Sequence, residues 1–199
     1  MKNYLEEAEL PEHTGDFECM AHHEAGHLVI AADQKLMLMS EGLAVAVGPP
    51  ARGIAFYCKH PDGSDRSVER ILISTFAGFM AQARFCKGNG HREYPNAAGW
   101  PIPNSCDLAE ARDVLLPQLL NCDLAKFGEE TEGLIEQHWR AIEGLASVLL
   151  AKPFEELTCR FKNGKPWFEG STTAKWIRGD EVVTILSQLG ISASCVAEC

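Results

Sequence analysis

The sequence predicts a mainly helical domain of the α+β class that carries one small β-hairpin or sheet. Long segments place apolar residues at spacings of three and four, which is typical of amphipathic helices. Two short apolar runs flank a turn at residues 48–53, as the strands of a hairpin do. With 199 residues, 46% of them hydrophobic and 23% charged, the chain suffices for one domain with a substantial core.

Local signals place the elements in chain order. The polar run at residues 62–65 suits the N-cap of a helix. Asn104 and Ser105 can cap a later helix, which Pro117 should bend or interrupt. We expect a single domain over residues 17–192, with a polar arm at 1–16 and a tail at 193–199. The expected elements are helices over 17–38, 66–86, 104–127, 131–150, 153–157 and 178–189, strands over 43–47 and 54–58, and a loop over 87–103.

Composition excludes several classes of partner. The net charge of −10 and the scattered lysines and arginines argue against a nucleic-acid backbone as the ligand. No run approaches the roughly 20 apolar residues of a membrane helix. The eight cysteines form no CxxC pair, and the acidic start lacks an apolar signal region. We therefore expect reduced cysteines in a cytoplasmic protein that binds neither nucleic acid nor membrane.

The most informative motif is HEAGH at residues 23–27, an HExxH pattern. His23 and His27 lie four residues apart and would project from the same face of a helix. Both imidazoles can then bind one Zn²⁺, while Glu24 lies beside the water as a general base. The motif predicts one zinc per chain in a helical, zincin-like domain.

A catalytic zinc needs a third protein ligand, and three carboxylates are candidates. Asp33 would need a sharp turn after the motif, but Ile30 stands where a glycine usually allows it. Glu41 immediately precedes a predicted strand. Asp107 lies in the first turn of a predicted helix, where the helix dipole alone also favours an acid. The residues themselves leave this choice open.

A resemblance to a known family favours Asp107. Residues 20–27, MAHHEAGH, look like the peptidase domain of the FtsH family of ATP-dependent zinc proteases. Residues 71–82 resemble the second helix of that domain, and residues 134–157 resemble its C-terminal part. Residues 104–111, NSCDLAEA, are similar to the segment whose aspartate is the third zinc ligand. The resemblance covers roughly residues 18–160 and implies that Asp107 completes the site.

The departures from that family bear on how the chain would work. It carries no nucleotide-binding loop, ATPase module or membrane anchor, so ATP hydrolysis is not expected of it. The family's Gly-Gly-Arg-Ala-Ala-Glu core reads AGFMAQ at residues 77–82, which removes an arginine and a glutamate near the site. We expect a stand-alone domain that acts on flexible or unfolded polypeptides. The sequence leaves its oligomeric state open, with a homo-oligomer or a delivery partner as the possible arrangements.

The functional hypothesis is a zinc-dependent endopeptidase with Glu24 as its base and His23, His27 and Asp107 as metal ligands. A strand in the hairpin region binds substrate in the resembling family, which points to the residues Gly53, Ile54, Ala55 and Phe56. The alternatives are a silent protein that binds zinc or peptides on the same fold, and a metal-dependent hydrolase of other substrates. The retained Glu24 favours catalysis, because a structural site needs no base.

The remaining histidines are expected to play lesser roles. His22 is rotated about 100° from His23 around the helix, which predicts a surface position or one beside the ligands. His138 lies on an apolar helical stripe and is expected to be a core histidine. His91 lies in the predicted loop before Asp107, from which it could approach the site.

Overall fold

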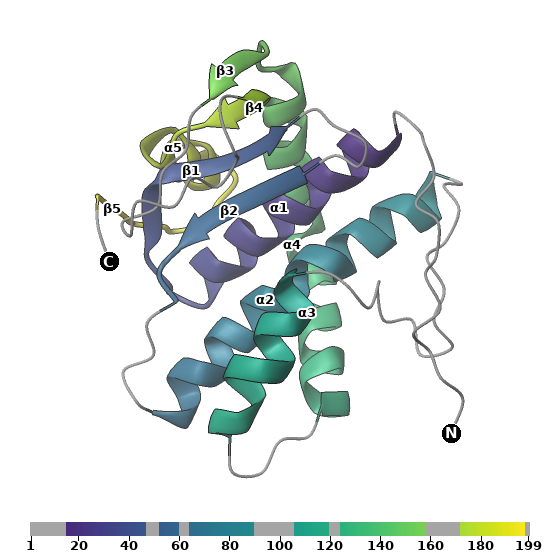
Figure 1. Ribbon diagram of the computed structural model, residues 1–199, viewed down its shortest axis with the longest axis vertical. Helices are drawn as coiled ribbons and strands as arrows, with labels where there is room; N and C mark the ends of the chain where they lie inside the picture. Colours follow the sequence, from purple (N-terminus) through teal and green to yellow (C-terminus); the bar gives the residue numbers. More distant parts are fainter. Residues whose placement is uncertain are drawn as a thin grey trace.

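The computed structural model describes residues 15–46, 52–59, 64–89, 106–119, 124–157 and 172–197. Within these ranges the protein is mainly helical with one small sheet, so the predicted class is confirmed at that level (Figure 1). The helices are α1 (Gly15–Asp33), α2 (Asp65–Gly88), α3 (Cys106–Glu110), α4 (Leu124–Ala151) and α5 (Gly179–Gln188). A π-helical turn (Ala111–Leu115) and a 3₁₀ turn (Leu116–Gln118) follow α3 directly.

The described strands form one five-stranded sheet. They are β1 (Leu38–Ala46), β2 (Arg52–Tyr57), β3 (Glu155–Leu157), β4 (Thr172–Ile177) and β5 (Cys195–Val196). The order is β2-β1-β4-β3 with antiparallel neighbours, and β5 pairs in parallel with the start of β1. The register between β1 and β2 shifts before Leu43, next to Gly42, whose φ of 73° suits a glycine. Among the described strands β2 is therefore an edge strand.

Helix α1 lies at the centre of the molecule. It packs against β1 and β2 on one side and against α2 and α4 on the other (Figure 1). Because it has neighbours on several sides, α1 is apolar around most of its circumference, and residues 21–32 are all buried. The core contains large side chains that are fully buried: Leu28, Ile30, Leu38, Leu72, Phe76, Ile142, Leu145 and Ile177.

The first helix ends at Asp33, five residues earlier than its apolar pattern suggests. Lys35 adopts a φ of 63°, the Leu36 amide donates to the Ala31 carbonyl, and the Lys35 amide donates to the Ala32 carbonyl. These are the two hydrogen bonds of a Schellman motif, here with lysine in the place that glycine usually takes. The turn lets Leu38 enter β1 and become fully buried.

Other elements differ from expectation in the second half of the chain. The helix expected over 104–127 ends at Gln118, and Phe127 belongs to α4, which begins at Leu124. Residues 155–157, expected to be helical, pair with β4 as a strand. Strands β4 and β5 were not expected at all, and β5 lies within the segment 193–199 assigned as a tail. The hairpin, α2, with its Ser64 N-cap, and α5 lie close to where they were expected.

Two further expectations concern membranes and cysteines. None of the described helices combines the length and the apolarity needed to cross a bilayer. Cys58 is disulfide-bonded. The expectation that all the cysteines are reduced is therefore wrong at Cys58.

Candidate metal centre

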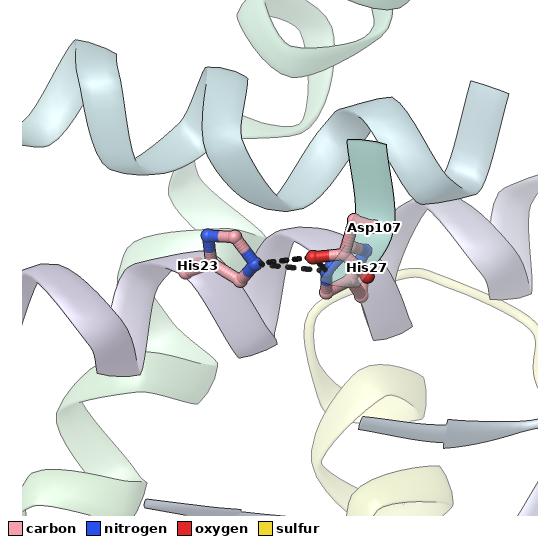
Figure 2. Close-up of side chains that lie close together, drawn as sticks. All are labelled: His23, His27 and Asp107. Carbon is pink, nitrogen blue, oxygen red and sulfur yellow. Dashed lines mark hydrogen bonds and ion pairs between the residues drawn. The ribbon is translucent and has the colours of Figure 1, made fainter. Parts of the chain in front are cut away.

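His23, His27 and Asp107 converge on one point between α1 and α3 (Figure 2). The Nε2 atoms of the two histidines lie 3.0 Å apart. The Oδ2 atom of Asp107 lies 3.0 Å from Nε2 of His23 and 3.3 Å from Nε2 of His27. Among the described residues, this group alone has three metal-ligating side chains arranged in this way. The structure thus brings together the three residues that the sequence suggested.

The other ring nitrogen of each histidine is held by a hydrogen bond. Nδ1 of His23 donates to Oε1 of Gln82 at 3.0 Å, and Nδ1 of His27 donates to the Ser74 carbonyl at 2.8 Å. A proton fixed on Nδ1 leaves the Nε2 lone pair directed at the shared point once the rings are neutral. Metal-bound histidines in proteins almost always have such an outer partner. Helix α2 therefore orients both candidate ligands.

The spacing of the three ligand atoms fits a zinc ion. Tetrahedral zinc with bonds of about 2.0–2.2 Å holds its ligand atoms roughly 3.3–3.6 Å apart. The three observed separations, 3.0, 3.0 and 3.3 Å, are close to this value and need only a small expansion. Two neutral nitrogens and one carboxylate oxygen also form a donor set typical of catalytic zinc. The Asp107 side chain keeps 20% of its surface exposed, so the group opens to solvent on one side.

Glu24 lies next to the ligands and is buried. Burial raises the pKa of its carboxyl group, while the charges of His23 and His27 act in the opposite direction. The backbone of β2 packs directly on this carboxylate: a Cβ added at Gly53 would lie 2.1 Å from Oε1 of Glu24. The strand therefore holds the candidate base in place.

The charges of the group favour a protonated His23 in the metal-free protein. Burial lowers the pKa of His23, but the hydrogen bond to Asp107 and the charges of Glu24 and Asp107 outweigh it and raise the pKa to about 9. Burial also acts to raise the pKa of Asp107, but the charge of His27 and the hydrogen bonds to both histidines outweigh it and lower the pKa well below the usual range. An ionised Asp107 therefore faces a cationic site.

Zinc affinity is expected to fall as the pH falls, because zinc binds the neutral imidazole and must displace the His23 proton. With a metal-free pKa of about 9, that proton alone weakens binding by about tenfold for each pH unit below 9. Competition against a chromophoric chelator at several pH values between about 6 and 8 measures this slope. An affinity that does not change with pH, after correction for the chelator, would contradict the expectation.

Small residues let α1 and α2 approach closely at the site. A Cβ at Gly26 would lie 2.7 Å from Cβ of Ala81 and 2.8 Å from the Ala77 carbonyl oxygen, so only glycine fits there. A Cβ at Gly78 would lie 2.2 Å from Nε2 of His27, the candidate ligand atom itself. Residues 77, 78 and 81 therefore provide the small side chains that this close approach needs.

The Gly78→Ala variant is expected to bind zinc at least about tenfold more weakly. Loss of a residue that orients a metal ligand typically weakens metal binding by about 10- to 100-fold, and displacement of the ligand itself should weaken it at least as much. The added methyl group would lie 2.2 Å from Nε2 of His27 and must displace the imidazole. Chelator competition measures the affinity. Gly88→Ala is the matched control, because it lies on the same helix with open space around the new methyl group. Equal affinities in the two variants would show that Gly78 does not hold His27.

The other candidate ligands lie away from this group. Oδ1 of Asp33 pairs with Nε2 of His138 at 3.0 Å, which joins the end of α1 to α4. Glu41 lies on β1 and accepts a hydrogen bond from Ser40. His138 is half-buried rather than a fully buried core residue. His91 lies outside the described residues.

His22 is buried, so the first of its two expected positions, on the surface rather than beside the ligands, is wrong. Its ring stacks on Phe85 with centroids 3.7 Å apart, and Nδ1 donates to the Glu18 carbonyl. Burial lowers its pKa, which favours the neutral ring. His22 therefore packs α1 against α2 and takes no part in the ligand group.

Three residues at the site have roles that the sequence did not suggest. In the sequence Gln82 is only a departure from a family motif, yet in the structure its side chain orients His23. Lys59, which follows β2, forms an ion pair with Glu110 at 2.5 Å and ties that strand to the helix that carries Asp107. No local pattern marks such a pair, because its members are far apart in the chain.

No protein-family model matches this chain, and no curated protein matches it. The resemblance to the FtsH peptidase domain therefore rests on the motifs alone, and membership of that family stays a prediction.

Proposed function

We propose that this protein is a zinc-dependent endopeptidase that cleaves flexible or unfolded polypeptides. One observation carries the proposal: two histidines and an aspartate converge on a point beside a buried glutamate. A site that only stabilises the fold would have no need of that glutamate. The two outer hydrogen bonds to the histidines and the open side at Asp107 also suit a catalytic site better than a closed structural one.

Each residue of the site has a separate role in the proposed hydrolysis of a peptide bond. Bound zinc would act as a Lewis acid on water and on the substrate carbonyl. His23, His27 and Asp107 would hold the ion, and their outer partners would keep both imidazoles in the ligating tautomer. Glu24 would take a proton from the attacking water and deliver it to the leaving amine. Its burial raises its pKa, which makes it a better proton acceptor than an exposed carboxylate.

Strand β2 is the proposed substrate-binding edge, through Gly53, Ile54, Ala55 and Phe56. Its one strand partner among the described residues is β1, so its outer edge offers backbone groups to an extended peptide. The backbone of Gly53 touches the Glu24 carboxylate, so a peptide added along this edge would pass close to the proposed base. Phe56 is buried and would act through the backbone alone.

The Gly53→Ala variant is expected to lose activity while it keeps its zinc. The new methyl group would collide with the Glu24 carboxylate and displace the base, whereas the metal ligands are held by α2 and α3. We expect a decrease in kcat/KM of at least about 100-fold, the smaller end of what a positioned general base contributes. Zinc content and hydrolysis of a quenched peptide are the two measurements.

Gly133→Ala on α4 serves as the control, because its new methyl group meets no atom within 4 Å. Full activity in Gly53→Ala would show that the contact with Glu24 is not needed. Loss of zinc would instead show that β2 supports the ligands rather than the base.

The direct test of the proposal is digestion of a pool of unstructured peptides by the zinc-loaded protein without ATP. Mass spectrometry should find internal cleavages that a chelator abolishes and that added zinc restores. Products that arise only by removal of terminal residues would overturn the assignment as an endopeptidase. A fully zinc-loaded protein that gives no products would favour the silent, peptide-binding alternative.

A further inference from the structure

Two cysteines meet between the helices that build the metal centre. Cys19 on α1 and Cys86 on α2 place their Sγ atoms 2.6 Å apart, and both side chains are almost fully buried. Cys19 lies one helical turn before His23, and Cys86 lies one turn after Gln82. The two thiols therefore lie next to the hydrogen bond that orients His23.

We propose that Cys19 and Cys86 form a disulfide that joins α1 to α2. The two sulfur atoms face each other without an intervening side chain, although 67 positions separate the residues along the chain. Cys58 is also disulfide-bonded, so a second bridge would not be the only oxidised pair in this structure. This inference does not depend on the proposed peptidase activity.

The bond forms by thiol–disulfide exchange with a small-molecule disulfide such as oxidised glutathione. One cysteine thiolate attacks the oxidant and forms a mixed disulfide, which releases one thiol. The second cysteine thiolate then attacks the mixed disulfide, forms the Sγ–Sγ bond and releases the other thiol. The two cysteines lose two electrons and two protons, and the oxidant takes up both. Because both thiols are buried, exchange takes place before α1 closes onto α2, and reductant reaches the bond when the protein unfolds.

Peptide mapping of the full-length protein tests the proposal. The reduced, denatured protein is refolded in a buffer that contains oxidised glutathione until the Cys58 disulfide is complete, then denatured again, alkylated and digested without reductant. We expect a linked peptide that contains Cys19 and Cys86. Quantitative alkylation of both residues in protein that carries the Cys58 bridge would overturn the proposal, and so would a link from either residue to another cysteine.

Thermal unfolding gives a second, independent readout. A bridge across so long a loop constrains the unfolded chain, so its loss should lower Tm by roughly 4 to 16 °C. Reductant should therefore lower the Tm of the wild type more than it lowers the Tm of the Cys19→Ala/Cys86→Ala variant. The difference between the two decreases should be roughly 4 to 16 °C. The Cys195→Ala variant, at a half-buried thiol away from the pair, should respond as the wild type does. An equal response of wild type and double variant would count against the bridge.

Discussion

Replacement of Glu24 by glutamine is expected to reduce kcat/KM for peptide hydrolysis by about 10²- to 10⁴-fold while zinc stays bound. Glutamine has nearly the same shape, so it can fill the space against Gly53, but it cannot accept a proton from water. The three proposed ligands are unchanged in this variant. Zinc content by metal analysis and cleavage of a quenched peptide together separate a loss of catalysis from a loss of metal.

Glu18→Gln is the matched control, because Glu18 lies on the same helix with an exposed side chain. It should keep both its zinc and its activity. If Glu24→Gln cleaves peptides as fast as this control, Glu24 is not the base and the proposed mechanism is wrong. If Glu24→Gln loses its zinc, Glu24 supports the metal site, and this variant does not test its role as a base. The activity of Gly53→Ala, which displaces Glu24 but leaves the ligands unchanged, then tests that role.

The Asp107→Ala variant is expected to bind zinc at least about 100-fold more weakly, since loss of an outer-shell partner alone costs 10- to 100-fold. The change removes one of three proposed ligands and the carboxylate that lies within 3.3 Å of both imidazoles. It also removes the contact that joins α3 to α1 at the site. Chelator competition gives the affinity, and the visible spectrum of the cobalt-substituted protein reports the remaining coordination.

The Asp33→Asn variant tests Asp33, which the sequence leaves beside Asp107 as a candidate for the third metal ligand. Its partner is His138, so the variant should keep the wild-type affinity for zinc even if its Tm decreases. Full zinc binding in Asp107→Ala together with weak binding in Asp33→Asn would reverse the assignment of the third ligand.

Local patterns in the chain were sufficient to locate the ligands on α1 and most helices. HExxH places two histidines on one helical face whatever surrounds that helix, because the spacing of four residues is itself the geometry. The hairpin, α2 and α5 likewise follow from apolar periodicity, a turn signal and a serine cap. These are properties of short segments, which the sequence specifies directly.

The end of α1 and the strands β3, β4 and β5 depended on distant partners. Residues 28–32 are apolar and would continue a helix, but burial of Leu38 in the sheet stops it at a left-handed Lys35. Residues 155–157 are a strand only because β4 is beside them. Short segments such as these have weak preferences of their own, and pairing decides their conformation.

The sequence by itself determined two of the three candidate ligands and the candidate base, since all three lie within five consecutive residues. The tertiary structure alone decided the rest. It brought Asp107 to the histidines from 80 residues away, used Asp33 to bind His138, and set Gln82 and Gly53 against the ligands and the base. The physical reason is that the packing of helices places a ligand at such a distance along the chain. The small residues at 26, 77, 78 and 81 allow α1 and α2 to approach closely, and this approach fixes the geometry of the site.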